Sequence, residues 1–327
     1  MAQFPPFVQF IIEYLNLLFG PASRLWPGYI LAFIFIAFVI YKFERSEGGF
    51  WRYLFPSQFY SSESVATDIK LFLFNGVIRT FDVASRIGVR ALVTIYVLQS
   101  LGGNIDEPSN IHPLLITLVL FLVGDFWTYL WHRINHTYEP FWVFHAVHHS
   151  AEFLVPFTSF RSHPLYGLFS RSLEVVIFGV MDGLLLALFV TSIEIHTLIG
   201  INTLSFIYAV TGNNLRHSHI WLGYGPILSR IFISPAMHQI HHSRAPKHYN
   251  KNYGGMFAIF DWAFGTLYIP KEKEELEFGI VDAQGNAIQP HNGFREAFFV
   301  PFKHLAQWYK NREKNDPNEL QRARSKT

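Results

Sequence analysis

The sequence predicts an all-α integral membrane protein, in which a bundle of about four spanning helices carries a helical cap. Half of the 327 residues are hydrophobic and only 15% are charged, whereas soluble domains carry about 25% charged residues. Several apolar runs approach the length needed to cross a bilayer. Twelve of the 16 histidines fall between His132 and His242, which marks this part of the chain as chemically distinct.

The composition excludes several kinds of site. Cysteine is absent, so disulfides, thiolate metal sites, iron–sulfur clusters and cysteine nucleophiles are impossible. The net charge is +2, which gives no basic field for nucleic acid, and we expect no such partner. Residues 7–20 are apolar, but no basic segment precedes them. This favours a short interfacial helix over a secretory signal.

The apolar runs define the expected spans. Residues 27–43 form the first, at the short end of the usual length, and residues 87–101 also read as embedded in the membrane. Residues 112–131 form a second strong span. Residues 168–211 hold about 40 mostly apolar positions, enough for a helical hairpin of two spans. The bend of this hairpin is expected at Thr191 to Glu194.

Charge in the connecting segments predicts the orientation. The segment 42–56 carries three basic residues, whereas residues 102–111 carry two acidic residues and no basic one. The positive-inside rule then places 42–56 in the cytoplasm and 102–111 outside. Counting spans brings both histidine-rich stretches, 132–166 and 212–250, to the cytoplasmic face. We expect a multi-pass protein of the bacterial inner membrane or the endoplasmic reticulum, with its site facing the cytoplasm.

Three short histidine motifs are the strongest chemical signal. One is HxxxH, whose spacing places both imidazoles on one helical face. The other two are HxxHH, in which the first histidine shares a helical face with both others, while the adjacent pair points about 100° apart. Such a pair can reach two neighbouring metal ions. The residues are His132 and His136, then His145, His148 and His149, then His238, His241 and His242.

A weaker histidine element lies between these motifs. His217 and His219 are two residues apart, a spacing that shares no helical face, so a loop or strand is needed or only one of them ligates. His163 follows Arg161 and precedes a proline, and we expect it to support the site or the fold rather than to bind a metal ion. A purely structural role for the three main motifs is disfavoured because buried polar clusters are costly.

A polar stripe runs into the second strong span. Asp125 and Tyr129 lead to His132 and His136 in steps of four, three and four residues, which keeps all four on one helical face. An ionisable residue within a span is usually functional. Asp125 is expected to orient a ligating histidine. Asp125, Asp261 or a bound oxygen species would balance the charge of two divalent cations held only by nitrogen.

Imidazole ligands suit iron, zinc, copper or nickel. The zinc-protease motif HExxH and the Glu-x-x-His motif of soluble di-iron bundles are both absent. These residues, taken in order, resemble the fatty acid hydroxylase/sterol desaturase superfamily of integral membrane di-iron enzymes. The match runs from Asp125 to about Tyr268. It includes the three motifs above, Arg161-x-His163-Pro164, Asn214-Leu215-Arg216-His217-Ser218-His219, Asn252-Tyr253-Gly254 and Asp261-Trp262-x2-Phe264-Gly265-Thr266.

The resemblance implies two iron ions, O2 as co-substrate, and hydroxylation or desaturation of a membrane lipid such as a sterol or a fatty acyl chain. It implies that the eight histidines of the three motifs are catalytic metal ligands, with Asp125, Tyr129, His163 and Asp261 around them. Some members carry a further HxxxH before the last motif, where this chain offers only His217 and His219. His219 has the family-like distance to His238, so we expect it to ligate in preference to His217.

The resemblance also divides the chain. Residues 1–111 are expected to form an N-terminal membrane region, 112–270 the catalytic domain, and 271–327 a cytosolic extension. Within the extension, residues 277–290 predict a small β-hairpin that turns at Gln284 to Asn286. Residues 293–312 carry aromatic side chains at helical spacing, which predicts an amphipathic helix on the membrane surface or on the catalytic domain.

Two other functions stay open at this point. A membrane electron carrier that binds haem by paired histidines needs them on separate spans near mid-bilayer, whereas these motifs lie beyond the span ends. A metal transporter needs ligands through its spans or in a flexible tract. No Rossmann fingerprint or cytochrome-like module is present, so electrons are expected from a separate ferredoxin, cytochrome or reductase. The sequence leaves open the lipid, the choice between hydroxylation and desaturation, and the oligomeric state.

Overall fold

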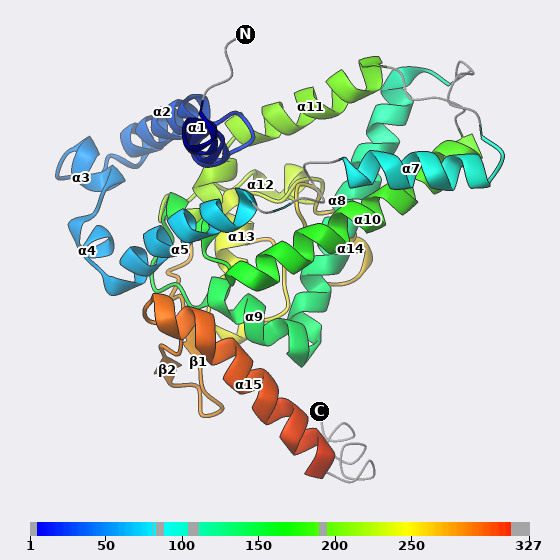
Figure 1. The fold of residues 1–327 in the computed structure, drawn as a ribbon. Helices are drawn as coiled ribbons and strands as arrows, with labels where there is room; N and C mark the ends of the chain where they lie inside the picture. The colour runs from blue at the N-terminus through cyan, green and yellow to red at the C-terminus, as the bar shows by residue number, and fades with distance from the viewer. Residues whose placement is uncertain (1–4, 81, 83–87, 104–110, 190–194, 315–327) are drawn as a thin grey trace.

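The computed structural model describes residues 5–80, 82, 88–103, 111–189 and 195–314. Most of the described residues are helical; α7, α8, α10 and α11 lie on one side of a more irregular part that contains short helices and loops, and α15 lies on the opposite side (Figure 1). This arrangement agrees with the predicted all-α architecture of a bundle with a cap.

Four of the described helices form the bundle. They are α7 (Val89–Ser100), α8 (Pro113–Thr137), α10 (Pro164–Phe189) and α11 (Ile195–Val210). α7 packs along α10, α11 packs along α8, and α10 also contacts α8. Two of the charges within α10 are paired: Arg90 of α7 binds Asp182 at 2.7 Å, and Arg171 binds Asp82 at 3.3 Å. Pairing is the usual condition for charged residues in an apolar setting.

α7 and α10 approach so closely that only glycine fits between them. A Cβ atom on Gly179 would lie 2.8 Å from the carbonyl oxygen of Arg90, and one on Gly183 would lie 2.8 Å from that of Thr94. The hydroxyl of Thr94 also donates to the carbonyl of Gly179 at 3.2 Å. Small residues four positions apart are the usual device for close helix contact in membranes.

We expect Gly179→Ala and Gly183→Ala each to destabilise the bundle by about 1–3 kcal/mol, because the added methyl group meets backbone rather than a movable side chain. The measurement is thermal unfolding of the purified protein in detergent. Gly124→Ala in α8 is the matched control, since its nearest neighbour would be a Phe178 ring atom at 3.8 Å. Equal unfolding temperatures for all three variants would contradict the close packing.

Two described helices are long and apolar enough to cross a membrane, Pro27–Glu44 (α2) and Leu114–Thr137 within α8. Only 11% and 28% of their residues are buried, so most of their apolar surface faces outward, as in a membrane protein. α10 and α11 occupy the expected hairpin, but α10 carries charges and α11 has 16 residues. Neither meets the same criteria. The bend expected at Thr191 to Glu194 lies outside the described residues.

The cap holds the segments that follow the bundle helices. Its main elements are α9 (Glu139–His149), the 3-10 turn η2 (Asn213–His217), α13 (Pro235–His241) and α14 (Ile259–Ala263). Proline in the first turn starts α9 and α13, and the Ser234 hydroxyl accepts from the Met237 amide at 3.3 Å to cap α13. The shorter elements are α3 (Phe50–Leu54), α4 (Ser57–Tyr60), η1 (Pro156–Phe160), α12 (Gly225–Leu228) and η3 (Pro246–His248).

The N-terminal helices pack on this cap. α1 (Pro6–Phe19) lies against α5 (Glu63–Thr80), and α5 contacts η1. In the middle of α2, Phe33 and Ala37 join Leu215 and Ile220 in one buried cluster. α2 therefore runs beside the second histidine-rich stretch.

The C-terminal extension has both expected elements. β1 (Ile280–Val281) pairs antiparallel with β2 (Ala287–Ile288), and the carboxylate of Asp282 accepts from the amides of Gln284 and Asn286 in the turn. The predicted hairpin is confirmed. Helix α15 (Phe294–Lys314) packs on α9 and α5 through its first turns and then extends away from them (Figure 1). The packing on α9 agrees with the predicted position on the catalytic domain.

Candidate metal centre

Nine histidines converge in the cap as two adjacent groups. In each group, one nitrogen of every ring lies within 4.8 Å of the corresponding nitrogens of the others. The first group is His132, His136, His145, His149 and His241, and the second is His148, His217, His238 and His242. The groups touch where the rings of His149 and His242 stack, with centroids 4.5 Å apart. Helices α8, α9 and α13 and the turn η2 supply eight of them, and His242 is the residue that directly follows α13.

Helical geometry sorts the members of each HxxHH motif between the two groups. His145 and His149, four residues apart, enter the first group, while His148 enters the second. In α13 the assignment is reversed, since His238 and His242 enter the second group and His241 the first. Adjacent histidines thus face different groups, as the rotation of about 100° per residue requires. Each HxxHH motif therefore contributes to both groups, whereas His132 and His136 both belong to the first.

Backbone carbonyl groups orient three of the rings. The Nδ1 atoms of His132, His148 and His241 lie 2.9, 3.2 and 2.7 Å from the carbonyl oxygens of Tyr253, Arg161 and Lys251. A nitrogen that faces a carbonyl must carry the proton and donate, so Nε2 of each ring is left with its lone pair. This is the arrangement in which an imidazole binds a metal ion through Nε2.

Most ring nitrogens that face the interior of the first group have no hydrogen-bond donor or acceptor beside them in the described residues. In the first group, Nε2 of His136, His145, His149 and His241 is buried without a hydrogen-bond partner in the described residues. In the second group, neighbouring Nε2 atoms lie 3.2–3.4 Å from one another. Burying so many unsatisfied acceptors costs free energy. Bound cations would satisfy them, so the donor set fits a pair of imidazole-ligated metal ions.

Burial keeps these imidazoles neutral. It is the main cause that lowers the pKa of His148 to about 3 and holds the pKa values of His149, His241 and His242 well below the ordinary value. The charges that neighbouring histidines would carry lower them further. The neutral form is the one that binds metal.

We therefore predict a steep loss of stability on acidification of the metal-free protein. Below pH 6.5 the unfolded chain binds protons on these histidines while the folded chain does not, so the free energy of unfolding falls as the pH falls. Each such histidine contributes up to about 1.4 kcal/mol per pH unit. Thermal unfolding of chelator-treated protein from pH 8 to pH 5 measures this.

Replacing one of these histidines should flatten the pH dependence. His149→Gln removes one lowered pKa, whereas His304→Gln changes an exposed residue and should leave the curve unchanged. A wild-type unfolding temperature that stays constant between pH 6.5 and pH 5 would show that the imidazoles are not held neutral by burial.

The preference for His219 over His217 is wrong. The Nε2 atom of His217 lies in the second group, whereas that of His219 lies 2.8 Å from the carbonyl oxygen of Tyr53 and its ring packs on Phe59. The turn η2 ends at His217, and Ser218 is extended, with φ −156° and ψ 168°. An extended residue sends the side chains on either side of it in different directions from those of a helix, so spacing along the chain could not select the ligand.

Asp125 does not orient a histidine, contrary to expectation. Its carboxylate accepts from the backbone amides of Met256 and Phe257 at 2.7 and 2.8 Å. Asp261 accepts from the amides of Tyr253 and Gly254 at 2.8 and 2.7 Å. Together the two carboxylates fix the loop whose Tyr253 carbonyl receives His132. They act on the metal ligands through the backbone.

Tyr129 and His163 also stand outside the two groups. The Tyr129 hydroxyl accepts from Arg133 at 3.0 Å and lies 3.3 Å from the Thr266 hydroxyl. The Nδ1 atom of His163 accepts from the amide of Tyr166, so its Nε2–H donates to the carbonyl of Phe298 at 2.9 Å. His163 thereby joins the start of α10 to α15 and does not contact a ligand.

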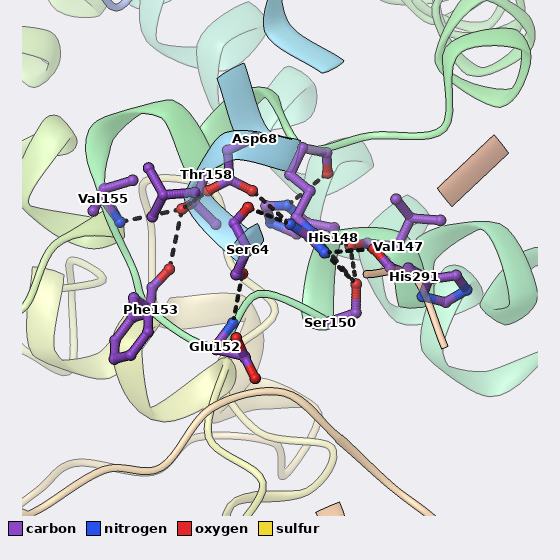
Figure 2. A network of polar contacts seen from close by, with 12 residues as sticks. Ser64, Asp68, Val147, His148, Ser150, Glu152, Phe153, Val155, Thr158 and His291 are labelled. Atoms are coloured by element: carbon purple, nitrogen blue, oxygen red, sulfur yellow. Dashed lines mark hydrogen bonds and ion pairs between the residues drawn. The ribbon is translucent and has the colours of Figure 1, made fainter. Parts of the chain in front are cut away.

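A buried ion pair beneath the site could not be expected from the sequence. The side chains of Arg161 and Asp68 are both 0% exposed, and their nitrogen and oxygen lie 2.7 Å apart. The Arg161 guanidinium also donates to the carbonyls of Val147, Ser64 and His291, at 2.8, 3.0 and 3.1 Å. Figure 2 shows how this network joins α5 to the end of α9 beside His148. Arg161 lies in a motif that the sequence singled out, but nothing distinguishes Asp68 from other acidic residues.

A cavity of about 350 Å³ leads to the histidines from the C-terminal side. Four of its lining residues belong to the two groups: His136, His149, His241 and His242. Trp142 packs against His136 and His149, with ring centroids 5.1 and 5.6 Å apart, and the hairpin residues Gly279 to Val281 form the outer wall. Trp142 and the hairpin backbone thus form part of the boundary between the histidines and the outside.

Comparison with known proteins finds a family match that covers the histidine-bearing segments. Residues 117–266 match the family model of the fatty acid hydroxylases. An ornithine lipid hydroxylase of Rhizobium tropici is 30% identical over 169 residues, which are 51% of this chain and 46% of that protein. An alkylglycerol monooxygenase of Homo sapiens is 29% identical over 187 residues, 57% of this chain and 36% of that protein.

A Delta(7)-sterol 5(6)-desaturase of Gibberella zeae is 27% identical over 154 residues, 47% of this chain and 38% of that protein. The chain therefore spans less than half the length of each of these relatives. No solved structure matches it. The ordered motifs, the two groups of histidines and the family match agree, and residues 117–266 form a fatty acid hydroxylase domain.

Proposed function

We propose that this protein is a membrane-bound oxidoreductase that hydroxylates or desaturates a lipid, using O2, two iron ions and electrons from a separate protein. The observation that carries the proposal is the pair of adjacent histidine groups with their buried, unpaired nitrogens. Relatives named as lipid hydroxylase, monooxygenase and sterol desaturase support the same reaction class. Haem offers a protein only two axial positions, fewer than the four or five imidazoles of either group.

The two groups would each hold one iron ion. Bound there, two iron ions supply the electrons that cleave O2 and the oxidant that an unactivated C–H bond requires. The chain's own residues prepare the site for this. The carbonyls of Tyr253, Arg161 and Lys251 keep Nε2 of His132, His148 and His241 free of a proton. Trp142 shields the rings of His136 and His149, and exclusion of water protects a strong oxidant from side reactions.

We further propose the topology. The predicted spans at 27–43, 87–101 and 112–131 and the hairpin at 168–211, which contain α2, α7, α8, α10 and α11, would cross the membrane, with one face of α2 against the cap and the rest toward lipid. The charge difference between residues 42–56 and 102–111 supports a cytoplasmic position for both histidine-bearing segments. A ferredoxin, cytochrome or reductase would then deliver electrons from the cytoplasm to the catalytic domain, residues 112–270, flanked by 1–111 and 271–327.

The direct test combines metal analysis with product analysis. Protein purified gently in detergent should contain about two iron ions per chain, given one ion per histidine group. Comparative lipid mass spectrometry of cells with and without the gene should reveal a lipid that gains one oxygen atom or loses two hydrogen atoms. A protein without metal, or one with b-type haem in a pyridine haemochrome assay, would overturn the proposal.

A further inference from the structure

A second cavity lies on the bundle side of the metal centre. It has a volume of about 790 Å³ and is bounded by α8, α11 and the segment before α2. Apolar and aromatic residues form much of its wall, including Phe121, Tyr29 and Phe206, and Phe206 is 46% exposed at the surface of α11. The cavity is therefore bordered by helices with apolar outer surfaces, where an acyl chain can reach it from a membrane.

Two arginines line this otherwise largely apolar cavity. Arg216 is 4% exposed, donates to the carbonyl of Ile233 at 2.9 Å and lies over the ring of Tyr208 at 4.9 Å. The Arg24 side chain has no hydrogen bond or ion pair with any described residue. The backbone carbonyl of Arg24 accepts from the Asn214 side chain at 2.8 Å. The turn η2 thus contains Arg216 and, through the side chain of Asn214, also holds the backbone of Arg24.

The charge in this cavity is unbalanced. Among its described lining residues, Asp125 is the sole carboxylate, and both of its oxygens accept backbone amides. Neither arginine forms an ion pair with a described residue. Arg216 is buried and Arg24 is partly exposed, and a cation removed from water is normally paired, because an isolated charge in an apolar setting is costly. A guanidinium without an acceptor beside a cavity points to a ligand that brings the anion.

The cavity is adjacent to the second histidine group. Arg216 directly precedes the group member His217, so their Cα atoms are about 3.8 Å apart. The cavity and the second histidine group therefore share the turn η2, which carries Arg216 on the cavity and His217 in the group.

We propose that Arg24 and Arg216 bind the anionic head group, a phosphate or a carboxylate, of the lipid that this protein oxidises. The planar guanidinium fork matches both anions in a two-point hydrogen-bonded geometry. The acyl or alkyl chain of the lipid lies along the apolar wall of the same cavity. This assignment rests on the proposed function, which it narrows from lipids in general to acidic amphiphiles.

The test measures binding without turnover. The full-length protein is titrated, at a fixed dodecyl maltoside concentration, with dodecyl phosphate, 1-dodecanol or inorganic phosphate, and its unfolding temperature is followed. Dodecyl phosphate should stabilise the protein saturably, while dodecanol and inorganic phosphate should have little effect. Arg24→Gln should weaken dodecyl phosphate binding by at least about tenfold, since a hydrogen bond to a charged group contributes about 1.5–3 kcal/mol.

Arg24→Gln is the informative variant because its side chain has no protein acceptor to lose. Arg216→Gln should act in the same direction and can also affect folding. Arg230→Gln is the matched control, an exposed arginine outside the cavity that bonds only to the Pro226 carbonyl, and it should bind like the wild type.

Three results would overturn the assignment: equal affinity of Arg24→Gln and the wild type, equally tight dodecanol binding, or equally tight inorganic phosphate binding. Tight binding of inorganic phosphate would indicate a site for a free anion. None of them bears on the proposed function, which fails instead if metal or oxidised product is absent.

Discussion

Replacing His241 with alanine should leave about one metal ion per chain and reduce lipid oxidation by more than about 100-fold. His241 belongs to the first histidine group, and its Nδ1–H is already held by the Lys251 carbonyl, so its Nε2 atom is oriented for a metal ion. Even residues that merely support a ligand change metal affinity by about 10–100-fold. His148→Ala should give the same loss from the second group. Iron analysis and product formation by mass spectrometry measure both effects.

His219→Ala is the matched control for these variants. It removes the same side chain from the same part of the cap, but His219 binds the Tyr53 carbonyl and lies outside both groups. We expect it to keep two metal ions and most of the activity. Loss of one metal ion in His219→Ala, or full activity in His148→Ala, would contradict the assignment of ligands. Insertion of each variant in the membrane fraction separates these outcomes from failure to fold.

Breaking the ion pair between Asp68 and Arg161 should have the largest effect on stability. Both side chains are fully buried, so Asp68→Asn leaves an uncompensated guanidinium, and removing one partner of such a pair costs about 3–5 kcal/mol. The Arg161 carbonyl also receives Nδ1 of His148, so the variant should lose metal from the second group before the first. Thermal unfolding and iron content test the two parts.

An exposed ion pair supplies the comparison. Arg244 and Glu277 lie 2.6 Å apart, but their side chains are 27% and 76% exposed. Glu277→Gln should therefore cost no more than about 1 kcal/mol and leave the iron content unchanged. If Asp68→Asn proved as harmless as Glu277→Gln, the network in Figure 2 would have no role in holding the site.

Local patterns explain why so much of the architecture could be predicted. The apolar run at 112–131 gives most of α8, and the β-hairpin and α15 follow from turn residues and helical spacing near Asn286 and Phe298. The packing partners of each helix could not be predicted in this way. Nothing in the sequence indicates that α2 runs beside residues 215–220, because an apolar helix can bury its surface in lipid or in protein equally well.

The candidate site divides in the same way. The eight histidines of the three motifs could be identified because regular helical spacing converts sequence directly into direction. His217 could not be chosen over His219, since they follow a 3-10 turn with an extended residue between them. The groups that orient His132 and His241 are backbone carbonyls. Every residue has a backbone carbonyl, so the sequence carries no signal for these groups, and the orienting role predicted for Asp125 belongs to the carbonyls.

The division of each HxxHH motif between the two histidine groups has a consequence for how this centre can change over evolution. Since His148 and His149 face different groups, as do His241 and His242, inserting or deleting one residue in α9 or α13 would rotate the later histidines by about 100°. Both metal positions would be damaged in one step. A substitution can affect one metal position alone, but a change of length in either helix affects both, so the spacing within these two short segments must be kept for both positions at once.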